Sequence, residues 1–419
     1  MRCRNAPLND KRSELCAKER ILFQANPGMP ACVRWPTVYV RTVEASSRKT
    51  KTMVSRYLPM HVQQHFGKQG VLIVNLGTPD APTPRAVNRY LGQFLTDERV
   101  VDNLPWPARQ AIFRGIVGPI RSGIVNPFKA GGSTKLYQEL WTENGSPLKY
   151  YGEVLADAVA KELGDDYIVR LAMRYQNPSI EFALRELMDA GVSAITVFPL
   201  FPQYASATTG SVHEEVMRLL SKEQIIPNVN LINSYYEHPA IIKIFADNAR
   251  ENFDLDSYDH IFFSYHGLPQ RHLKKGDRTG CYCYADGTNK CCHTIQKVNQ
   301  FCYSAQCHAT TAAIAKELGL RPEQYTTSYQ SRLGFDDWAK PYTIDVLEEW
   351  AKERGAKKLL CFSPAFVADC LETTIEIGLE YQEEFEEWGG ERIDLVPSLN
   401  DDPRWIAAVA EMIRAETGS

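Results

Sequence analysis

The sequence predicts an α/β protein made of two Rossmann-like domains, each with a parallel sheet flanked by helices, and with a cleft between them. From about Gly70 onward, short apolar and β-branched runs alternate with amphipathic stretches of about 10–15 residues, the pattern of βαβ units and parallel sheets. Such units are too many for one sheet of ordinary size, and 419 residues are enough for two or three domains. Two sheets therefore fit better than one.

The elements follow one another regularly along the chain. The first strand is expected within 70–79, where it runs into a turn marked by Asn75, Gly77 and Pro79. Further strands are expected at 167–173, 194–200, 229–234, 260–264, 324–328, 358–362 and 392–396. Helices are expected at 84–94, 147–163, 178–190, 209–220, 239–252, 305–318, 343–354, 370–388 and 403–416. The stretch 104–135, punctuated by Pro and Gly, is mixed and is expected to form a lip or lid over a pocket.

These elements divide the chain into three regions. Residues 69–200 are expected to form the first domain, and residues 201–401 the second, with a Cys-rich insert at 276–307. Residues 1–68 differ, with about 13 Lys and Arg against 4 Asp and Glu and no sustained period. This basic N-terminal extension is interpreted as a disordered targeting segment or as the product of an upstream start codon, with Met53 or Met60 as the true start.

Composition excludes several classes of protein. The net charge of −4 gives no overall attraction to nucleic acid, and the chain has no apolar run long enough to span a membrane. This composition is compatible with peripheral contact to a membrane. Six of the 11 cysteines lie between Cys281 and Cys307, a clustering that favours a reducing compartment and a local metal site over a disulfide framework. The expected location is the cytoplasm, with contact to the inner membrane left open.

The first candidate site residue is His266. It follows an apolar strand and precedes Gly267 and Pro269, so it is expected just beyond the carboxyl end of that strand. Ligands of open α/β sheets bind in the crevice at these ends. An imidazole there can accept a proton or bind a metal ion near neutral pH, whereas the structural alternative is an ordinary loop histidine.

A row of carboxylates is the second candidate. Its members are spaced three, four and four residues apart, which predicts one face of a helix: Asp369, Glu372, Glu376 and Glu380. That helix also begins after a strand, so its first turn is expected to point to the same crevice as His266. An ordinary solvated acidic face is the alternative. Facing an imidazole, the carboxylates could bind a divalent metal ion, move protons, or do both.

Polar residues also follow two strands of the first half. Arg174 is a candidate for binding an anionic group of a ligand. Tyr204 offers a hydroxyl, and the run TTGS at 208–211 fits the cap of the next helix. No G-x-G-x-x-G follows the first strand and no G-x-x-x-x-G-K-[ST] occurs, so nucleotide binding is disfavoured.

The Cys-rich insert is the third candidate. Closely spaced thiols suit structural zinc or an iron–sulfur cluster, because both take thiolate ligands. The spacings C-x-C, C-C and C-x4-C do not match the paired C-x2-C pattern of zinc sites, and the sequence alone does not choose the metal.

Taken together, these motifs resemble the ferrochelatase family, most closely its proteobacterial branch. The matching stretches occur in order from about residue 70 to the C-terminus: VLIVNLGTPDAP (71–82), GSPL (145–148), RY (174–175), FPQY (201–204) with TTGS (208–211), SYHGLP (264–269), QSRLG (330–334) with Trp338, and DCLE (369–372). No single motif would be specific, but the ordered set is.

The resemblance implies two chelatase-like domains around a porphyrin cleft, with a C-terminal helix at 402–419 that packs back onto the first domain. It implies insertion of Fe²⁺ into protoporphyrin IX, the last step of haem synthesis, with release of two protons. His266 matches the active-site histidine and Glu372 its partner carboxylate, the two groups expected to meet the iron. Asp369 and Glu376 match the acidic path beside them. The positions that match the porphyrin pocket are Leu76, Arg174, Tyr204 and Trp338.

Some proteobacterial members carry a 2Fe–2S cluster in an internal insert like this one. By that resemblance the expected ligands are Cys283, Cys292, Cys302 and Cys307, with Cys281 and Cys291 as substitutes. The expected partners are protoporphyrin IX and Fe²⁺, without nucleic acid, in a monomer or homodimer. Three alternatives stay open: a coproporphyrin III chelatase, a sirohydrochlorin chelatase, and an inactive regulator that binds haem or an iron–sulfur cluster.

Overall fold

The computed structural model describes residues 22–23, 38–39, 67–123, 132–332 and 336–418. The chain divides into two units, Met1–Met60 and His61–Ser419. In the first unit, the described residues are β1 (Leu22–Phe23) and β2 (Val38–Tyr39), which pair antiparallel. The rest of the expected basic extension, apart from residues 67–68, lies outside the described residues.

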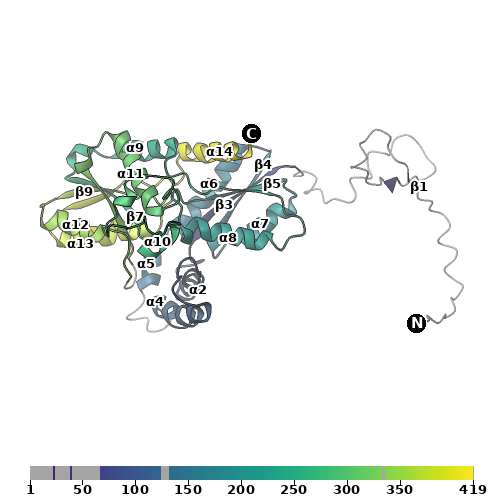
Figure 1. The fold of residues 1–419 in the computed structure, drawn as a ribbon, viewed down its shortest axis with the longest axis horizontal. Coiled ribbons are helices and arrows are strands. Elements are labelled where there is room, and N and C mark those ends of the chain that lie inside the picture. Colours follow the sequence, from purple (N-terminus) through teal and green to yellow (C-terminus); the bar gives the residue numbers. More distant parts are fainter. Residues whose placement is uncertain (1–21, 24–37, 40–66, 124–131, 333–335, 419) are drawn as a thin grey trace. The chain divides into compact units, whose positions relative to one another are not determined.

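The first sheet of the second unit has four parallel strands in the order β4-β3-β5-β6 (Figure 1). They are β3 (Gln69–Gly77), β4 (Tyr167–Tyr175), β5 (Ala194–Pro199) and β6 (Asn228–Leu231). Alternate residues of these strands face opposite layers of helices, as the period of two requires. One layer is α6 (Pro147–Leu163) with α14 (Pro403–Thr417), and the other is α7 (Ile180–Asp189) with α8 (Ser211–Leu220).

The second sheet has four parallel strands in the order β10-β9-β7-β8. They are β7 (His260–His266), β8 (Tyr325–Gln330), β9 (Lys358–Phe362) and β10 (Arg392–Leu395). One face packs on α9 (Pro239–Asn252) and α11 (Tyr303–Leu318). The other packs on α12 (Thr343–Lys352), η8 (Leu371–Tyr381) and α13 (Gln382–Glu387).

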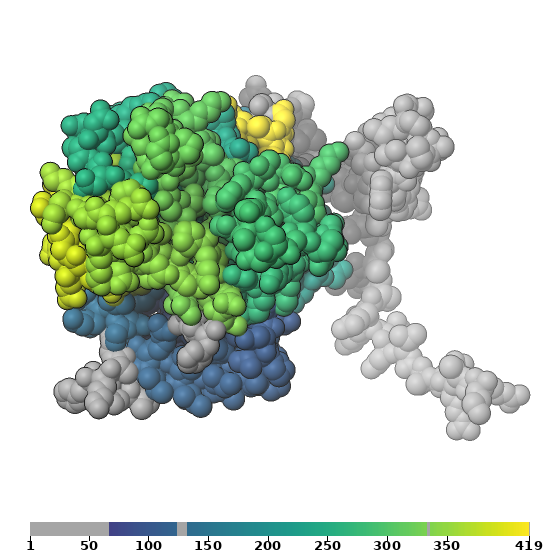
Figure 2. Space-filling model, turned by 60° about the vertical axis from the view of Figure 1, so that its left-hand side comes forward, coloured from purple at the N-terminus to yellow at the C-terminus, as the bar shows by residue number. Residues whose placement is uncertain are grey.

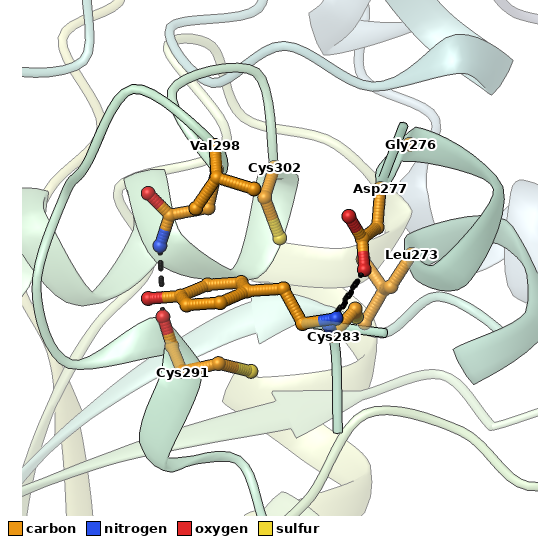
Figure 3. A pocket seen from close by; sticks show the side chains of 9 residues that line it. Leu273, Gly276, Asp277, Cys283, Cys291, Val298 and Cys302 are labelled. Carbon is orange, nitrogen blue, oxygen red and sulfur yellow. Dashed lines mark hydrogen bonds between the residues drawn. The ribbon is translucent and has the colours of Figure 1, made fainter. Parts of the chain in front are cut away.

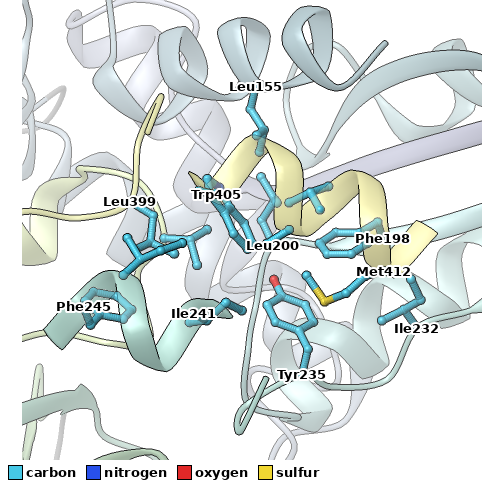
Figure 4. Close-up of a cluster of buried hydrophobic side chains, with 14 of the residues drawn as sticks. Leu155, Phe198, Leu200, Ile232, Tyr235, Ile241, Phe245, Leu399, Trp405 and Met412 are labelled. Carbon is cyan, nitrogen blue, oxygen red and sulfur yellow. The ribbon is translucent and has the colours of Figure 1, made fainter. Parts of the chain in front are cut away.

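A shared hydrophobic core joins the two sheets around α14. Trp405 of this helix is fully buried beside Phe198 of β5 and Tyr235, with Ile241 of α9 in the same cluster (Figure 4). The helix contacts both α6 and α9, so the last segment of the chain packs against elements of both halves. Burial of these large side chains stabilises the arrangement of the two sheets.

The expected lip at 104–135 is helical in the structure. It contains α3 (Trp106–Arg109), η3 (Gln110–Val117), α4 (Gly118–Arg121) and α5 (Gly132–Leu140), next to α2 (Pro84–Phe94), while 124–131 lie outside the described residues. Figure 1 shows α2, α4 and α5 gathered beneath the sheets, and α5 contacts η8. The remaining short helices are η4 (Ser206–Gly210), η5 (Leu255–Ser257), α10 (Gln270–Gly276), η6 (Lys290–Cys292) and η7 (Pro322–Gln324). No described helix has the length and apolar character needed to cross a bilayer.

Three details differ from the sequence analysis. The strand expected at 229–234 is β6, which pairs with β5 in the first sheet, so the first sheet extends past residue 200. β7 continues two residues beyond 264, because its pairing with β8 runs as far as His266 and Gln330. The helix expected at 370–388 begins at Leu371 and is a π-helix over its first 11 residues, a form often found at functional sites.

Candidate functional site

His266 is the last residue of β7, so it stands at the carboxyl edge of the second sheet. Its partly exposed side chain places Nδ1 2.7 Å from the carbonyl oxygen of Gly267. Because a carbonyl oxygen only accepts, the neutral ring carries its proton on Nδ1 and presents a lone pair on Nε2. The His266 carbonyl accepts a hydrogen bond from the Tyr303 hydroxyl at 3.0 Å. The Nε2 atom is thus the group that can accept a proton or bind a metal ion.

Trp338 lies beside His266. The two ring centroids are 6.4 Å apart, and a backbone bridge between Trp338 and Pro269 attaches the tryptophan to the loop that follows the histidine. The indole is buried. The structure therefore brings these two predicted site residues together, although they are 72 positions apart in the sequence.

Glu376 of η8 is held by four hydrogen bonds. Its Oε1 accepts from the Ser331 backbone N–H at 2.8 Å and from the Tyr381 hydroxyl at 2.9 Å. Its Oε2 accepts from the Ser331 hydroxyl at 2.5 Å and from Gln330 Nε2 at 3.0 Å. A carboxylate has about four acceptor positions, and here all four are used.

Glu372 lies in the first turn of η8 and is partly exposed. Its neighbours include Tyr90 of α2 and Tyr137 of α5. Burial raises the pKa of Tyr90 well above its ordinary value, and the charge of Glu372 raises it further. The pKa of Tyr137 is raised by burial first, then by Tyr90 and Glu372. The carboxylate therefore sits where η8 meets the helices that follow the first strand.

Asp369 does not share a helical face with the glutamates. It precedes η8, and its Oδ2 accepts a hydrogen bond from Asn400 Nδ2 at 2.9 Å. The single row of four carboxylates was therefore wrong at its first member, because the backbone between β9 and η8 is not helical there. The other members stay close: the pKa of Glu380 is raised by burial first and then by Glu376. Catalytic roles for Asp369 and Glu376 stay predictions.

At the carboxyl edge of the first sheet, Arg174 already has partners within the chain. Its Nη2 donates to Asp97 Oδ2 at 2.8 Å, and its Nε donates to the Ser211 hydroxyl at 2.6 Å. Tyr175 and Ser211 also donate to Asp97 Oδ2, whose side chain is only 5% exposed. This network ties the segment after α2 to β4 and α8. Binding of a substrate anion by Arg174 stays a prediction. The guanidinium would have to bind that anion while it also binds Asp97.

Leu76 and Tyr204 lie at the same edge. Leu76 is the next-to-last residue of β3 and is partly exposed. Tyr204 follows β5; its backbone N–H donates to Gln306 Oε1 of α11 at 2.6 Å, and its ring meets Phe301 edge-on at 6.3 Å. Tyr204 is thus anchored to the second half of the protein. The roles of both residues in binding substrate stay predictions.

The Cys-rich insert brings four of its six thiols together. Cys283, Cys291 and Cys302 line one small cavity with Asp277, and Figure 3 shows the sulfurs of Cys291 and Cys302 pointing toward the same space. Cys292 belongs to the group, because its Sγ lies 3.8 Å from Cys291 Sγ and it is hydrogen-bonded to Cys302. That hydrogen bond lowers the pKa of the Cys302 thiol below its ordinary value.

The other two cysteines do not line this cavity, although burial raises the pKa of the Cys307 thiol and Cys302 is close enough to raise it further. Cys307 is fully buried within α11, where its thiol contacts the Tyr303 hydroxyl, and Cys281 is exposed. All six are free thiols. In the described parts of the chain, no three Cys, His, Asp or Glu side chains stand at metal-coordinating distances. The donor set of four neighbouring thiols nevertheless has the chemistry of a thiolate-ligated centre.

Sequence reasoning missed the residues that organise the site. Gln330 and Ser331 bind η8, Asp97 binds Arg174, and Tyr303 binds His266. Gln330 and Ser331 belong to the recognised QSRLG stretch, and their position at the end of a strand was a usable signal. Their partners lie tens of residues away, so only the folded chain reveals what they bind.

The fold and this edge define a two-domain α/β protein with a site suited to metal ions and protons. Comparison with known sequences assigns it further. The sequence model of the ferrochelatase family matches residues 68–417. The chain is 42% identical over 353 residues to the ferrochelatase of Legionella pneumophila (strain Lens), which covers 83% of this chain and 99% of that protein. It is 43% identical over 347 residues to the ferrochelatase of Coxiella burnetii (strain Dugway 5J108-111), covering 83% and 93%.

The chain therefore belongs to the ferrochelatase family, whose members are metal-inserting lyases. Among solved structures, SirB from Bacillus subtilis with Fe³⁺ matches with a TM-score of 0.43 and 11% identity, over 83% of this chain and 95% of that one.

Proposed function

We propose that this protein inserts Fe²⁺ into protoporphyrin IX, forming protohaem and releasing two protons, as the last step of haem synthesis. The observation that carries the proposal is the similarity to ferrochelatases along nearly their whole length. The alternative of an inactive regulator has less support, because His266 and Glu372 are both present at the edge of the second sheet.

The reaction requires groups that take protons from the two pyrrole N–H groups while the iron loses its water. The Nε2 lone pair of His266 accepts one of these protons, since Nδ1 carries its own proton and donates to Gly267. Glu372, in the first turn of η8, is the carboxylate proposed to accept the second proton or to contact the iron. Trp338, whose buried indole lies beside His266, supports the loop that carries the histidine, and its contact with the macrocycle stays a prediction. Leu76, Arg174 and Tyr204 complete the proposed substrate contacts from the first sheet.

The test uses the full-length protein under anaerobic conditions with Fe²⁺ and three tetrapyrroles. We expect kcat/KM for protoporphyrin IX to exceed that for coproporphyrin III and sirohydrochlorin. A preference for coproporphyrin III would replace the proposed substrate while keeping the reaction. No metallation of any of the three would overturn the enzyme assignment and favour the regulator.

We further propose that the insert binds a 2Fe–2S cluster through the four neighbouring thiols, Cys283, Cys291, Cys292 and Cys302. This ligand set replaces Cys307 of the sequence-based set by Cys291. Support comes from the shared cavity and from the contact of Cys307 with Tyr303 instead. When bound, such a cluster would contribute structural stability or sensing, because metal insertion transfers no electrons.

Iron and acid-labile sulfide are to be measured together with the visible spectrum of anaerobically purified protein. We expect the Cys291→Ser variant to lose the cluster, and the matched Cys281→Ser and Cys307→Ser variants to keep it. If Cys307→Ser loses the cluster and Cys291→Ser keeps it, the ligand set predicted from the sequence, with Cys307 in place of Cys291, is correct. Bound zinc without sulfide would change the metal but keep the ligands.

We also propose a cytoplasmic protein that contacts the inner membrane through α3, η3 and α4. Trp106, Ile116 and Ile120 are 64%, 56% and 43% exposed, which is unusual for side chains of this size. Flotation with anionic lipid vesicles tests this surface: the wild type is expected to float, and Trp106→Ser with Ile116→Ser is expected to float less. Equal flotation of both proteins would remove the proposed contact.

A further inference from the structure

The side chain of Gln330, the last residue of β8, uses all of its hydrogen-bonding groups at the site. It is 2% exposed. Its Oε1 accepts from the Ser264 hydroxyl of β7 at 2.6 Å, and its Nε2 donates to the Glu372 carbonyl oxygen at 2.9 Å and to Glu376 Oε2 at 3.0 Å. The Glu372 carbonyl can only accept, so it fixes the orientation of the Gln330 amide.

This orientation sets the direction of a buried chain of hydrogen bonds. The Ser264 hydroxyl donates its one hydrogen to Gln330, so Thr343 must donate to Ser264 across their 2.9 Å contact. Ser328 must then donate to Thr343 across 3.0 Å. The chain starts on β8, passes through α12 and β7, and ends at the Gln330 amide, which in turn donates to η8. All of these groups are buried, so losing one partner would leave another unsatisfied.

The backbone of Gln330 is bound to the histidine loop. Gln330 is the register partner of His266, and its carbonyl oxygen accepts from the Gly267 N–H at 2.9 Å. The approach is close: a Cβ on Gly267 would lie 2.9 Å from that oxygen and 3.1 Å from Trp338. One residue therefore contacts both the loop of His266 and the first turn of the helix that carries Glu372.

Ser331 extends this contact. Its φ of 63° is in the left-handed region, which is uncommon for a residue other than glycine and costs free energy. In this conformation both its N–H and its hydroxyl donate to Glu376. With Gln330 and Tyr381, these bonds occupy the carboxylate fully, so Glu376 serves as the anchor of η8.

We infer that Gln330 is a positioning residue that sets the geometry between His266 and Glu372, with Glu376 as the group through which it holds η8. The inference rests on the proposed roles of His266 and Glu372 in iron insertion. Catalytic groups must be held within fractions of an ångström, and a displacement of about 1 Å can reduce the rate about 100-fold. Gln330 touches neither reacting group with its side chain and acts through the segments that carry them.

The test compares two glutamines that each make three hydrogen bonds. Gln382 of α13 donates to Glu386 and to the Glu391 carbonyl and accepts from the Ile393 N–H, so it joins α13 to β10 without touching the site. We expect Gln330→Met to lower kcat about 10- to 100-fold with porphyrin affinity nearly unchanged, whereas Gln382→Met keeps kcat near wild type. Porphyrin affinity is measured by fluorescence quenching. A thermal unfolding curve gives the folded fraction of each variant at the assay temperature, and kcat is calculated for that fraction.

A second variant separates hydrogen bonding from shape. Gln330→Glu keeps the size of the side chain and the bond from Ser264, but it places an acceptor against the Glu372 carbonyl and Glu376. We expect kcat to fall at least as far as in Gln330→Met. If both Gln330 variants keep the kcat of Gln382→Met, the inference is wrong. If the wild-type protein makes no haem, the proposed function is wrong instead. Assaying the wild type beside the variants therefore distinguishes a wrong function from a wrong role of Gln330.

Discussion

The carboxyl edge of the second sheet and the Cys-rich insert both gather side chains that can bind a metal ion, but they satisfy their polar groups in opposite ways. At the sheet edge, Gln330 and Glu376 are completely hydrogen-bonded within the protein. In the insert, the thiols of Cys283, Cys291 and Cys302 line a cavity and mainly contact one another. The edge is therefore pre-organised by the chain itself, whereas the insert has the donor set of a site completed by a ligand.

Helix α10 connects the two regions, and Asp102 holds it from outside. This aspartate follows α2 and accepts hydrogen bonds from Arg271 at 2.7 Å and from Lys275 at 2.5 Å, and it contacts His272 at 3.0 Å. Figure 2 shows green segments of the second half lying above the blue helical segments that follow the first strand. A change in the insert can thus reach the loop of His266 through α10, and also through Tyr303 of α11, whose hydroxyl donates to the His266 carbonyl oxygen.

The largest expected effect is on activity at the edge. Replacing His266 by Ala removes the Nε2 base, and we expect kcat to fall by about 10²–10⁴-fold. The fold should remain, because the ring is partly exposed and its only described hydrogen bond is local. Haem formation and far-UV circular dichroism are measured together. Near-normal turnover by a folded variant would contradict the assignment of His266.

The second-largest effect on activity at the sheet edge is expected for Gly267→Ala. The new Cβ would crowd the Gln330 carbonyl and Trp338, so the loop must shift, costing about 1–3 kcal/mol of stability and about tenfold in kcat. Gly276→Ala, at the end of α10, is the matched control because no atom lies within 4 Å of its Cβ position. Urea unfolding and kcat are compared. Equal behaviour of the two variants would mean that the close contact at Gly267 is not needed.

A third prediction contrasts the two ends of β7. Burial lowers the pKa of His260, at the start of the strand, to about 4; Arg354 adds to this effect and Glu349 opposes it. Unfolding returns the pKa to its ordinary value of about 6.5, so the unfolded state binds more protons between these values. The contribution of His260 to stability is complete above about pH 6.5 and declines toward pH 4, by about 3 kcal/mol in all.

The variant His260→Phe keeps an aromatic ring on Trp350, whose centroid lies 3.9 Å away, but cannot be protonated. We expect its free energy of unfolding, measured in urea from pH 4 to pH 7.5, to depend less on pH than that of the wild type. The same pH dependence in both proteins would show that other groups, rather than His260, cause it.

The smallest expected effect concerns Asp102. Burial alone would raise the pKa of this carboxyl, but hydrogen bonds from Lys275, Arg271 and His272 lower it below its ordinary value. Its stabilisation is therefore present above about pH 4, the ordinary value, and is lost as the pH falls further. Asp102→Asn should lower the free energy of unfolding at pH 7 by about 1–2 kcal/mol. The difference between variant and wild type should become smaller below about pH 4.

Limited proteolysis of the Asp102→Asn protein would sharpen the comparison between the two regions. We expect faster cleavage in the insert at unchanged cleavage elsewhere, because α10 loses its outer contact. Protection equal to the wild type would show that the stability of the insert does not depend on the contacts of Asp102 with α10.

The local pattern of the sequence determined the type and order of the elements and placed His266 at a strand end, since hydrophobic period and turn residues act over a few positions. It also located the Cys-rich insert and, through ordered motifs, the family. Only the tertiary structure decided that β6 joins the first sheet, that η8 is a π-helix starting after Asp369, and which four thiols meet. It also decided that Gln330 binds Glu376, 46 positions away. A polar side chain finds such partners through the topology of the chain, and no periodicity of its neighbours encodes that distance.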